Sequence, residues 1–350
     1  MQVLFGVIYH FIGGFASGSF YIPYKKVRDW SWESYWIVGG LFSWLLAPFI
    51  AAYLTVPNFM DIIRNTDSTT LFWTYVLGVL WGIGGLTFGL TMRYLGMSLG
   101  MAIVLGFCSA FGALIPPIYR DLFTDDTKGT FSSMLGSTGG QIVLLGVAVC
   151  LAGIYICGKA GVMKENELSD AEKKESVKEF DFWKGIIVAT ISGVLSACFN
   201  FGIEAGKVMA EAALVNGSNP LFQNNVIFVP LLWGGLTTNF IWCMILNTRN
   251  RTFGDYTNAK APLKTNYMFS AIAGTTWFLQ FFFYGMGESK LGNGASSWIL
   301  HMACIIIVSN VWGIYFKEWK GVSSITYRTI ILGIATVILS VFIVGIGNYW

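Results

Sequence analysis

Charged residues are scarce in this chain of 350 residues: Asp, Glu, Lys and Arg make up 12% of it, against 55% hydrophobic residues. There are only two histidines, and the six cysteines stand singly, without the paired spacing that disulfides or metal centres use. We interpret these cysteines as small packing residues. A net charge of +3 gives no reason to expect a nucleic-acid partner. The sequence therefore predicts neither a metal site nor a cofactor.

What the chain has in abundance is apolar runs of roughly twenty residues, long enough to cross about 30 Å of hydrocarbon as helices. No alternating ten-residue pattern typical of barrel strands occurs. The sequence predicts an all-α integral membrane protein in the lipid bilayer, with ten transmembrane helices. We expect them at about 3–22, 32–54, 70–92, 97–118, 138–159, 182–206, 223–246, 265–287, 295–316 and 325–347.

Lysine and arginine are distributed unequally between the connections. The odd-numbered connections hold 17 basic residues and the even-numbered ones hold 5, which accounts for all 22. Because basic loops stay in the cytoplasm, the odd connections should face the cytoplasm and both termini the outside. Met1 runs into the first span without a basic segment or cleavage site, so we expect the first helix to be retained.

A charged stretch from Lys164 to Asp181 separates two blocks of five spans. We expect a first repeat at 1–160, a cytoplasmic linker at 161–181 and a second repeat at 182–350. Five is an odd number, so the two repeats must be inverted relative to each other. Weak internal similarity agrees, with matches at an offset of 179 between spans one and six and of 196 between spans three and eight, as in Trp81 and Trp277. Inverted repeats are typical of transporters with a site at the membrane midplane.

Polar residues inside the spans point to that site, because a charge at mid-bilayer costs roughly 2.5 to 3.5 kcal/mol on insertion scales. Span one carries a polar face of His10, Gly13, Gly14, Ser17 and Tyr21, and span six carries Ser192, Ser196, Asn200, Glu204 and Lys207. Span eight aligns Trp277, Gln280, Phe281, Tyr284 and Glu288, and span nine presents Ser297, Trp298 and His301. Aromatic faces and directional hydrogen-bonding groups together are what a sugar requires.

Each of these residues also has a purely structural interpretation. A single histidine in a membrane helix can bond a neighbouring carbonyl, and Glu204 and Lys207 are close enough on one helix face to form an ion pair. Tryptophans near span ends, such as Trp30 and Trp32, suit the interfacial belt. The close glycine spacing of four, as in Gly78 and Gly82, serves helix packing as well as it would serve sliding surfaces.

Several strings resemble the bacterial L-rhamnose/proton symporter family. They are 20–27 (FYIPYKKV) with 30–33 (WSWE), 89–98 (GLTMRYLGMS), 277–284 (WFLQFFFY), 297–302 (SWILHM) and 317–319 (KEW). They occur in both halves and in the right order. The segments 120–137 and 162–180 show no useful resemblance. His10, Glu33, Arg93, Lys207, Asn239, Gln280 and His301 stand where the family pattern has the same residue, whereas Glu204 replaces an uncharged one.

The resemblance implies a fold of the drug/metabolite transporter superfamily, with two inverted five-helix repeats, in a bacterial inner membrane. It also implies import of L-rhamnose, with L-lyxose or L-mannose as related sugars, together with protons by alternating access. The residues expected to bind the sugar are His10, Tyr21, Trp81, Asn200, Asn239, Trp277, Gln280, Tyr284, Trp298 and His301. The expected proton-coupling residues are His10, Glu33, His301 and Glu204, of which His10 comes first because imidazole titrates near neutral pH.

Two other functional classes are weighed against this one. An exporter or exchanger of another metabolite would keep the fold, but an anionic substrate would need a buried basic residue, and the mid-span positions have none. A membrane-bound enzyme would need a catalytic constellation at the membrane surface. No metalloprotease His-Glu pair, cysteine/histidine pair or paired carboxylates occur at a suitable spacing, so we expect no enzyme activity.

Overall fold

The computed structural model describes residues 2–95, 97–125, 127, 129–167, 181–315, 319 and 321–347, and the regular structure within these ranges is helical. The first half contains α1 (Gln2–Ser19), α2 (Tyr21–Tyr24), α3 (Trp32–Gly40), the π-helix η1 (Leu41–Leu46), α4 (Ala47–Thr55), α5 (Phe59–Asn65), α6 (Ser68–Leu95), α7 (Met97–Phe123), α8 (Phe131–Gly136) and α9 (Thr138–Glu167). The second half contains α11 (Phe182–Ala205), α12 (Lys207–Val215), η2 (Pro220–Phe222), α13 (Asn225–Asn250), η3 (Phe253–Tyr256), α14 (Leu263–Leu291), α15 (Gly294–Tyr315) and α16 (Ser324–Gly347).

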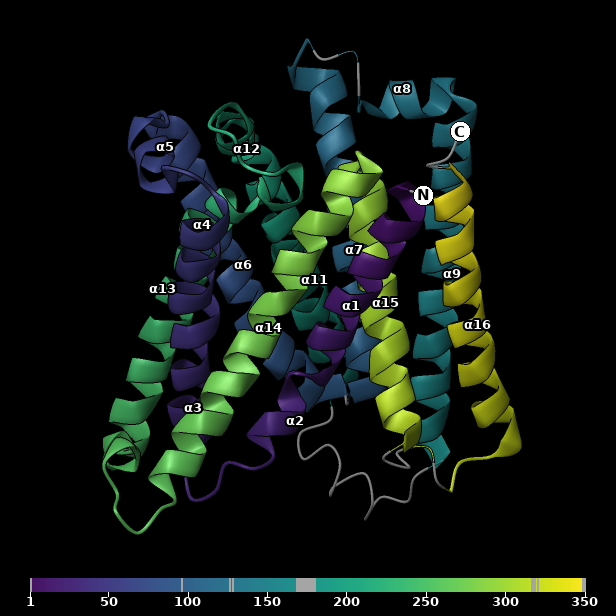
Figure 1. Cartoon of the computed structure of the whole chain (residues 1–350). Coiled ribbons are helices and arrows are strands. Elements are labelled where there is room, and N and C mark those ends of the chain that lie inside the picture. Colours follow the sequence, from purple (N-terminus) through teal and green to yellow (C-terminus); the bar gives the residue numbers. More distant parts are fainter. Residues whose placement is uncertain are drawn as a thin grey trace.

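The long helices run side by side as one bundle (Figure 1). Both ends of the chain lie at the same end of the bundle, together with the short helices α5, α8 and α12. The connections from α2 to α3 and from α13 to α14 lie at the opposite end. Each of the ten predicted spans falls on one long helix or on a run of consecutive helices.

Eight helical stretches in the described part of the chain are long and apolar enough to cross a membrane. They are Gln2–Tyr24, Trp32–Thr55, Ser68–Thr91, Ile103–Phe123, Thr138–Lys164, Trp183–Val215, Pro220–Asn250 and Ser324–Gly347. The two remaining predicted spans correspond to α14 and α15. α14 has 29 residues but carries polar side chains along its length, and α15 contributes a shorter apolar stretch, Ser296–Ser309. An integral membrane protein is therefore supported, with eight of the ten predicted spans meeting both conditions.

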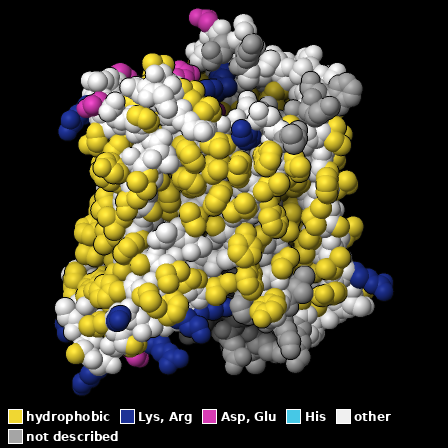
Figure 2. All heavy atoms as spheres, in the orientation of Figure 1, with side chains coloured by type: hydrophobic (Ala, Val, Ile, Leu, Met, Phe, Trp, Pro, Cys, Tyr) yellow, Lys and Arg dark blue, Asp and Glu magenta, His cyan; other side chains and the backbone are white. Residues whose placement is uncertain are grey.

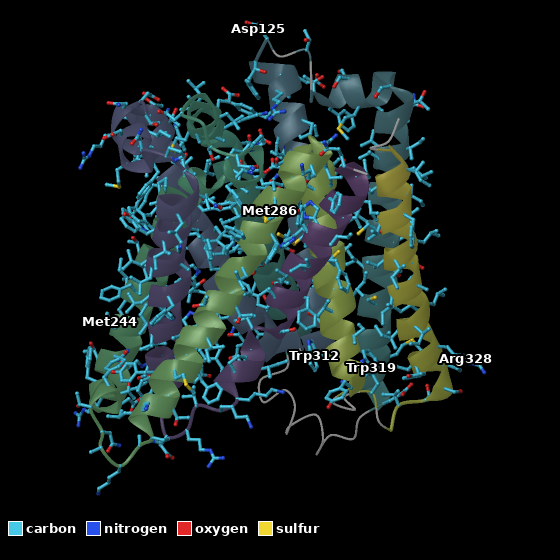
Figure 3. The ribbon with its side chains drawn as sticks, viewed as in Figure 1. Asp125, Met244, Met286, Trp312, Trp319 and Arg328 are labelled. Carbon is cyan, nitrogen blue, oxygen red and sulfur yellow. The ribbon has the colours of Figure 1, made fainter. Side chains whose placement is uncertain are left out.

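The surface of the bundle agrees with this placement. Figure 2 shows hydrophobic side chains over the middle of the molecule, with most charged side chains near its two ends. Large apolar residues such as Leu54, Tyr155 and Phe342 are more than half exposed, which is unfavourable in water but suits contact with lipid tails. Figure 3 labels a charged residue at each end of the bundle, Asp125 at one end and Arg328 at the other.

Side-chain caps fix where helices begin. The carboxylate of Asp67 accepts the backbone N–H groups of Thr69 and Thr70 at 3.0 and 2.8 Å, which satisfies the first turn of α6. These hydrogen bonds lower the pKa of Asp67 to about 2. At the start of α11, the Asp181 carboxylate accepts the N–H of Lys184 at 3.0 Å. The helix that carries Asn200 therefore starts at a defined residue.

The two halves pack against each other rather than forming separate units. α1 contacts α14 and α15 of the second half, and α11 contacts α6 and α7 of the first half. α6 packs on α13, α14 packs on α3, and α9 packs on α16. Because α1, α14 and α15 meet, the polar faces of spans one, eight and nine are brought together inside the bundle.

Glycines allow two of these contacts to become backbone contacts. A Cβ atom on Gly78 of α6 would clash with the carbonyl oxygen of Leu231 on α13, and one on Gly274 of α14 would clash with that of Gly39 on α3. Such close approach is how membrane helices associate when lipid offers no hydrophobic driving force. At these two positions, the packing interpretation of the glycines is sufficient.

We predict that Gly78→Ala destabilises the protein by about 1 to 3 kcal/mol, because the added methyl group must push α6 away from α13. Thermal unfolding of the purified protein in detergent measures this change. Gly85→Ala on the same helix is the matched control, since nothing lies within 4 Å of its Cβ position. Equal unfolding midpoints for the two variants would show that the backbone contact contributes nothing to stability.

Candidate functional site

Two histidines and a tyrosine from three helices meet inside the bundle. The ring of His10 on α1 lies edge-on to Tyr284 of α14, with 5.5 Å between centroids, and to His301 of α15 at 5.7 Å. The Tyr284 and His301 rings are 5.3 Å apart. All three side chains are at most 2% exposed. We refer to them as the histidine cluster; the sequence predicted all three as site residues.

Two glycines make the space that the imidazoles occupy. A Cβ atom on Gly287 of α14 would lie 2.6 Å from Nε2 of His10, and one on Gly13 of α1 would lie 2.9 Å from Cε1 of His301. Met286, next to Gly287, is labelled in the interior of the bundle in Figure 3. Each histidine therefore rests directly on the backbone of the neighbouring helix, which holds the rings in place without a hydrogen bond.

The imidazole nitrogens themselves have no hydrogen-bond partner among the described residues, and the same is true of Nε2 of Gln280. A buried polar group without a partner costs about 1 to 3 kcal/mol. The interpretation that His10 simply bonds a neighbouring carbonyl does not hold in this structure. Unsatisfied buried polar groups mark places where a ligand, a water molecule or an ion can supply the missing hydrogen bonds.

Hydrogen bonds fix the surroundings of the histidine cluster. The Tyr284 hydroxyl donates to Oδ1 of Asn200 on α11 at 3.1 Å, and Nδ2 of Asn200 donates to the carbonyl oxygen of Gly112 on α7 at 2.7 Å. The indole N–H of Trp298 donates to the carbonyl oxygen of Cys108, also on α7, at 2.9 Å. Asn200 and Trp298, both predicted site residues, thus tie the cluster to helices of the first half.

Aromatic side chains continue from the cluster along α14. Trp277 lies against Phe20 with 4.2 Å between centroids, and Phe281 contacts Trp81 of α6 at 5.6 Å. Trp81 in turn packs on Phe199 at 5.1 Å. Trp81, Trp277 and Gln280 therefore belong to one tract with the histidine cluster.

Two predicted sugar-binding residues lie apart from this tract. Oδ1 of Asn239 on α13 accepts the indole N–H of Trp36 at 3.0 Å, and its Nδ2 donates to the Gly235 carbonyl of its own helix at 2.9 Å. Tyr21 is 43% exposed and packs on Phe20 and Tyr24. Asn239 bonds protein groups through both its side-chain oxygen and its side-chain nitrogen, and Tyr21, in α2, is only partly buried.

Glu33, predicted as a proton-coupling residue, lies in the first turn of α3 and is buried. Its carboxylate accepts a hydrogen bond from Nδ2 of Asn250 at 2.9 Å and another from the Thr252 hydroxyl at 2.8 Å. The neighbouring Ser34 donates to Asp255 at 2.8 Å. This polar group joins α3 to the end of α13 and is not part of the histidine cluster.

Glu204, the remaining proton-coupling candidate, forms an ion pair with Arg120 of α7. The alternative considered from sequence, a pair with Lys207, is not the contact that forms. Close by, the carboxylate of Glu288 accepts a hydrogen bond from Nδ2 of Asn224 at 2.5 Å. Both carboxylates border Gly294, whose Cβ position lies 3.0 Å from Glu204 and 3.6 Å from Glu288. The sequence placed Glu288 on the polar face of span eight, but it did not indicate that Asn224 is its partner.

Sequence reasoning missed a second polar feature, formed by Ser43 and Trp44 of η1. Both are buried, and their Oγ and Nε1 atoms have no partner among the described residues. They border a narrow cavity lined by Phe20, Tyr24, Trp36, Gly39, Gly40, Ser43, Trp44, Gly274 and Trp277. Span two shows no polar stripe, because a π-helix changes the side-chain period that such a stripe requires.

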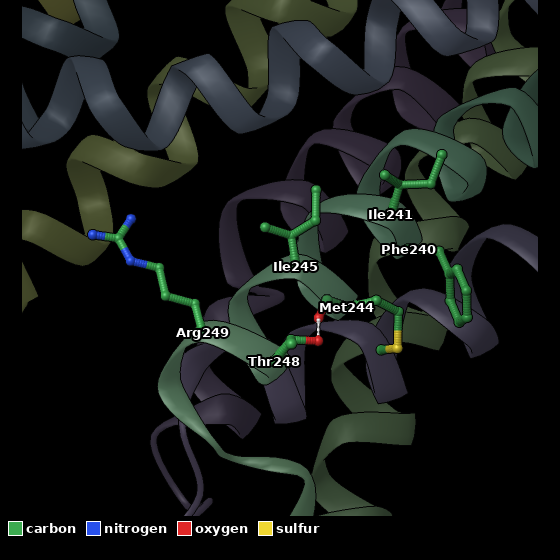
Figure 4. Close-up of a pocket in the computed structure, with 6 residues that line it drawn as sticks. All are labelled: Phe240, Ile241, Met244, Ile245, Thr248 and Arg249. Carbon is green, nitrogen blue, oxygen red and sulfur yellow. Dashed lines mark hydrogen bonds between the residues drawn. The ribbon is translucent and has the colours of Figure 1, made fainter.

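A larger pocket lies elsewhere, on the surface of α13 (Figure 4). Its lining residues are Phe240, Ile241, Met244, Ile245, Thr248 and Arg249, all from one helix. The Thr248 hydroxyl donates to the Met244 carbonyl at 2.8 Å and so is already satisfied. A depression on one exposed apolar helix suits lipid tails better than a polar substrate.

The site as a whole offers neutral hydrogen-bonding groups and aromatic faces. Among the described residues, no three His, Cys, Asp or Glu side chains are grouped so that they could hold a metal ion. All six cysteines are free and buried, in agreement with their interpretation as packing residues. The chemistry available is reversible binding and proton exchange.

Comparison with known proteins agrees with this chemistry. Residues 1–349 match the family model described as "L-rhamnose-proton symport protein (RhaT)". Proteins named L-rhamnose-proton symporter from Yersinia pestis (strain Pestoides F) and Pectobacterium atrosepticum are each 37% identical to this chain over 350 residues, which covers 99% of it and 98% of each relative. The family and both relatives are named as symporters, which are transporters and not enzymes. The match spans the whole bundle, and the chain belongs to the L-rhamnose-proton symport protein family.

Proposed function

We propose that this protein is a secondary active transporter that imports L-rhamnose together with protons across a bacterial inner membrane. The observation that carries the proposal is the buried histidine cluster, whose imidazole nitrogens have no partner among the residues that the structure describes. A cluster of this kind binds a neutral polar solute and can exchange a proton at the same place. The names of the relatives specify the solute as L-rhamnose for those proteins.

The packing of the helices supports two inverted five-helix repeats. If span one is exchanged with span six, span two with span seven, and so on, the contact of α1 with α14 becomes that of α11 with α6. The contact of α1 with α15 becomes that of α11 with α7, and the contact of α3 with α14 becomes that of α13 with α6. An exchange that maps contacts onto contacts is expected of repeats related by a twofold axis. We therefore assign ten membrane-spanning helices, α14 and α15 included, and the fold of the drug/metabolite transporter superfamily.

The basic residues supply the orientation of this bundle. The cytoplasmic face is the end that carries the α2–α3 and α13–α14 connections, since these are odd-numbered and rich in lysine and arginine. Both termini lie at the other end of the bundle (Figure 1), which we assign to the periplasm. Glu33 then lies near the cytoplasm, and Glu204 and Glu288 near the periplasm.

We predict that a reporter active only in the periplasm, such as alkaline phosphatase, is active when fused after residue 347 and inactive when fused in the linker near residue 170. A reporter active only in the cytoplasm should give the opposite pattern, because the basic connections stay inside. Activity of the periplasmic reporter at the linker would reverse the assigned orientation.

In the proposed site the sugar lies between the histidine cluster and the aromatic residues of α14. Its C–H groups face Trp277 and Phe20, and its hydroxyl groups bond Gln280 and the imidazole nitrogens of His10 and His301. These are groups that lack a hydrogen-bond partner within the protein, so hydrogen bonds to the sugar offset a desolvation penalty that the free protein already carries. Asn200 and Trp298 position Tyr284 and the wall of the site.

Proton coupling is assigned first to His10 and His301. Two imidazoles 5.7 Å apart disfavour a second positive charge once one of them is protonated. The pair therefore takes up one additional proton at a time, and that proton converts an acceptor nitrogen facing the sugar into a donor. We assign Glu33 and Glu204 to the two ends of the bundle, where their hydrogen bond and ion-pair partners hold helices together.

The energy available is sufficient for this function. One proton moving through about 150 mV releases roughly 3.5 kcal/mol. Since each tenfold gradient costs about 1.4 kcal/mol, a neutral sugar can be accumulated a few hundredfold. No further energy source is needed for uptake at a stoichiometry of one proton per sugar.

We predict that proteoliposomes containing the protein take up radiolabelled L-rhamnose when an inward pH gradient is imposed and lose that uptake when the gradient is collapsed by a protonophore. L-Mannose and L-lyxose should compete, and L-fucose should compete less. Uptake that is independent of the gradient, or absent, would favour an exporter or exchanger of another metabolite on the same fold.

We predict that His10→Gln abolishes accumulation of L-rhamnose against its gradient but retains exchange of labelled for unlabelled sugar. Glutamine keeps a hydrogen-bonding group but cannot take up a proton. The two assays are run on the same proteoliposomes, so retained exchange shows that the variant is folded. Unchanged accumulation would remove His10 from the coupling mechanism.

A further inference from the structure

The second span is interrupted by a π-helix at a position that faces the interior. α3 passes into η1 at Leu41 and returns to α-helix as α4 at Ala47. π-helical segments are rare and frequently occur at functional sites. This one turns Ser43 and Trp44 inward, where they are 1% and 4% exposed. Gly40 accommodates the indole, because a Cβ atom there would lie 2.7 Å from Cε3 of Trp44.

Three hydrogen-bond donors border the cavity beside this segment without a partner in the described part of the chain. They are the Ser43 hydroxyl, the Trp44 indole N–H and the Trp277 indole N–H. The remaining walls are aromatic rings and the backbone of Gly39, Gly40 and Gly274. None of the described residues that line the cavity is charged. The cavity is too narrow for a whole sugar, but neutral donors on aromatic walls suit a hydroxyl group that projects from one and disfavour an ion.

The cavity borders the proposed sugar site through Trp277. Trp277 lines it from α14, and Gln280 and Tyr284 follow on the same face of that helix at intervals of three and four residues. Nε2 of Gln280 is unpartnered as well. The unsatisfied groups therefore form one series along α14, from Ser43 and Trp44 to the histidine cluster.

The corresponding elements of the second half differ from this arrangement. Span seven, the counterpart of span two, has no such interruption, because α13 is a continuous α-helix over Asn225–Asn250. Trp277 corresponds to Trp81, whose ring is covered by Phe199 and Phe281 at 5.1 and 5.6 Å. Trp277 lines the cavity, whereas Trp81 does not.

We propose that Ser43 and Trp44, together with Trp277, form a subsite that determines which sugar is bound by donating hydrogen bonds to hydroxyl groups of a neutral monosaccharide. The inference rests on the proposed function, since it assumes that the sugar occupies the tract along α14. It assigns to the π-helix the role of presenting two donors to one cavity.

The test is the affinity of the full-length protein for L-rhamnose, measured by equilibrium binding in detergent. Trp44→Phe keeps the ring and removes the donor, and we expect it to weaken binding about tenfold, the effect of one lost hydrogen bond to a buried group. Trp233→Phe on α13 is the matched control. Its indole nitrogen is also buried and unpartnered, but it does not line the cavity. The control should bind L-rhamnose within about twofold of the parent protein.

Analogues of L-rhamnose that each lack one hydroxyl group separate recognition from packing. If Trp44 donates to one hydroxyl, the analogue without that group binds the parent and Trp44→Phe with equal affinity, whereas the other analogues still distinguish them. Ser43→Ala, measured in the same way, provides a second variant if Trp44→Phe fails to fold. It should lose affinity and show its own hydroxyl dependence.

The outcomes are distinguishable. Unchanged affinity in both Trp44→Phe and Ser43→Ala, or an equal loss with every analogue, overturns the subsite and leaves the transport function intact. Failure of the parent protein to bind L-rhamnose, with a normal unfolding transition, instead overturns the proposed function.

Discussion

The structure depends on the cost of placing a polar group inside a membrane protein without a partner. Most such groups are satisfied across helix boundaries, as Asn200 is by Gly112 and Tyr284, and Trp298 by Cys108. Seven bulky side chains in the described part of the chain are exceptions. Five of them border one tract along α14, namely His10, Trp44, Trp277, Gln280 and His301, and the other two are Trp30 and Trp233. The protein provides hydrogen-bond partners for both polar atoms of the Asn200 side chain, so it could equally have provided partners for the two histidines. Their lack of partners is best explained by a ligand that supplies them.

The helix packing is repeated between the two halves, whereas the proposed site is not. Helix contacts are preserved when the halves are exchanged, and the glycine contact of α6 with α13 has its counterpart in that of α14 with α3. His10 has no such counterpart. At the offset of 179, His10 corresponds to Ala189, which is buried in an apolar group with Val104. A symmetric scaffold allows two equivalent packings, whereas a single substrate requires only one set of binding groups.

The parts of this arrangement that could be predicted from sequence are those fixed by local periodicity. Runs of about twenty apolar residues defined the helices, and the polar stripes on spans one, eight and nine placed His10, Tyr284 and His301 on facing surfaces. Contacts that depend on the relative positions of distant helices were not predictable. The pairing of Glu204 with Arg120 rather than Lys207 joins residues 84 positions apart. The π-helix was not predictable either, because its side chains follow neither the helical nor the strand period.

The distribution of polar contacts suggests how the proposed transport cycle is energetically possible. The ties formed by Glu204 with Arg120 and by Glu33 with Asn250 lie towards opposite ends of the bundle, where water can replace a broken partner. Arg120 and Glu204 are each 20% exposed, so water that enters as that end opens can take over their hydrogen bonds. The backbone contacts of Gly78 and Gly274 lie within each pair of packed helices and would be costly to separate. Conformational change should therefore break the polar contacts at one end of the bundle and keep the α6–α13 and α3–α14 pairs intact. A proton worth roughly 3.5 kcal/mol is then large enough to bias which end opens.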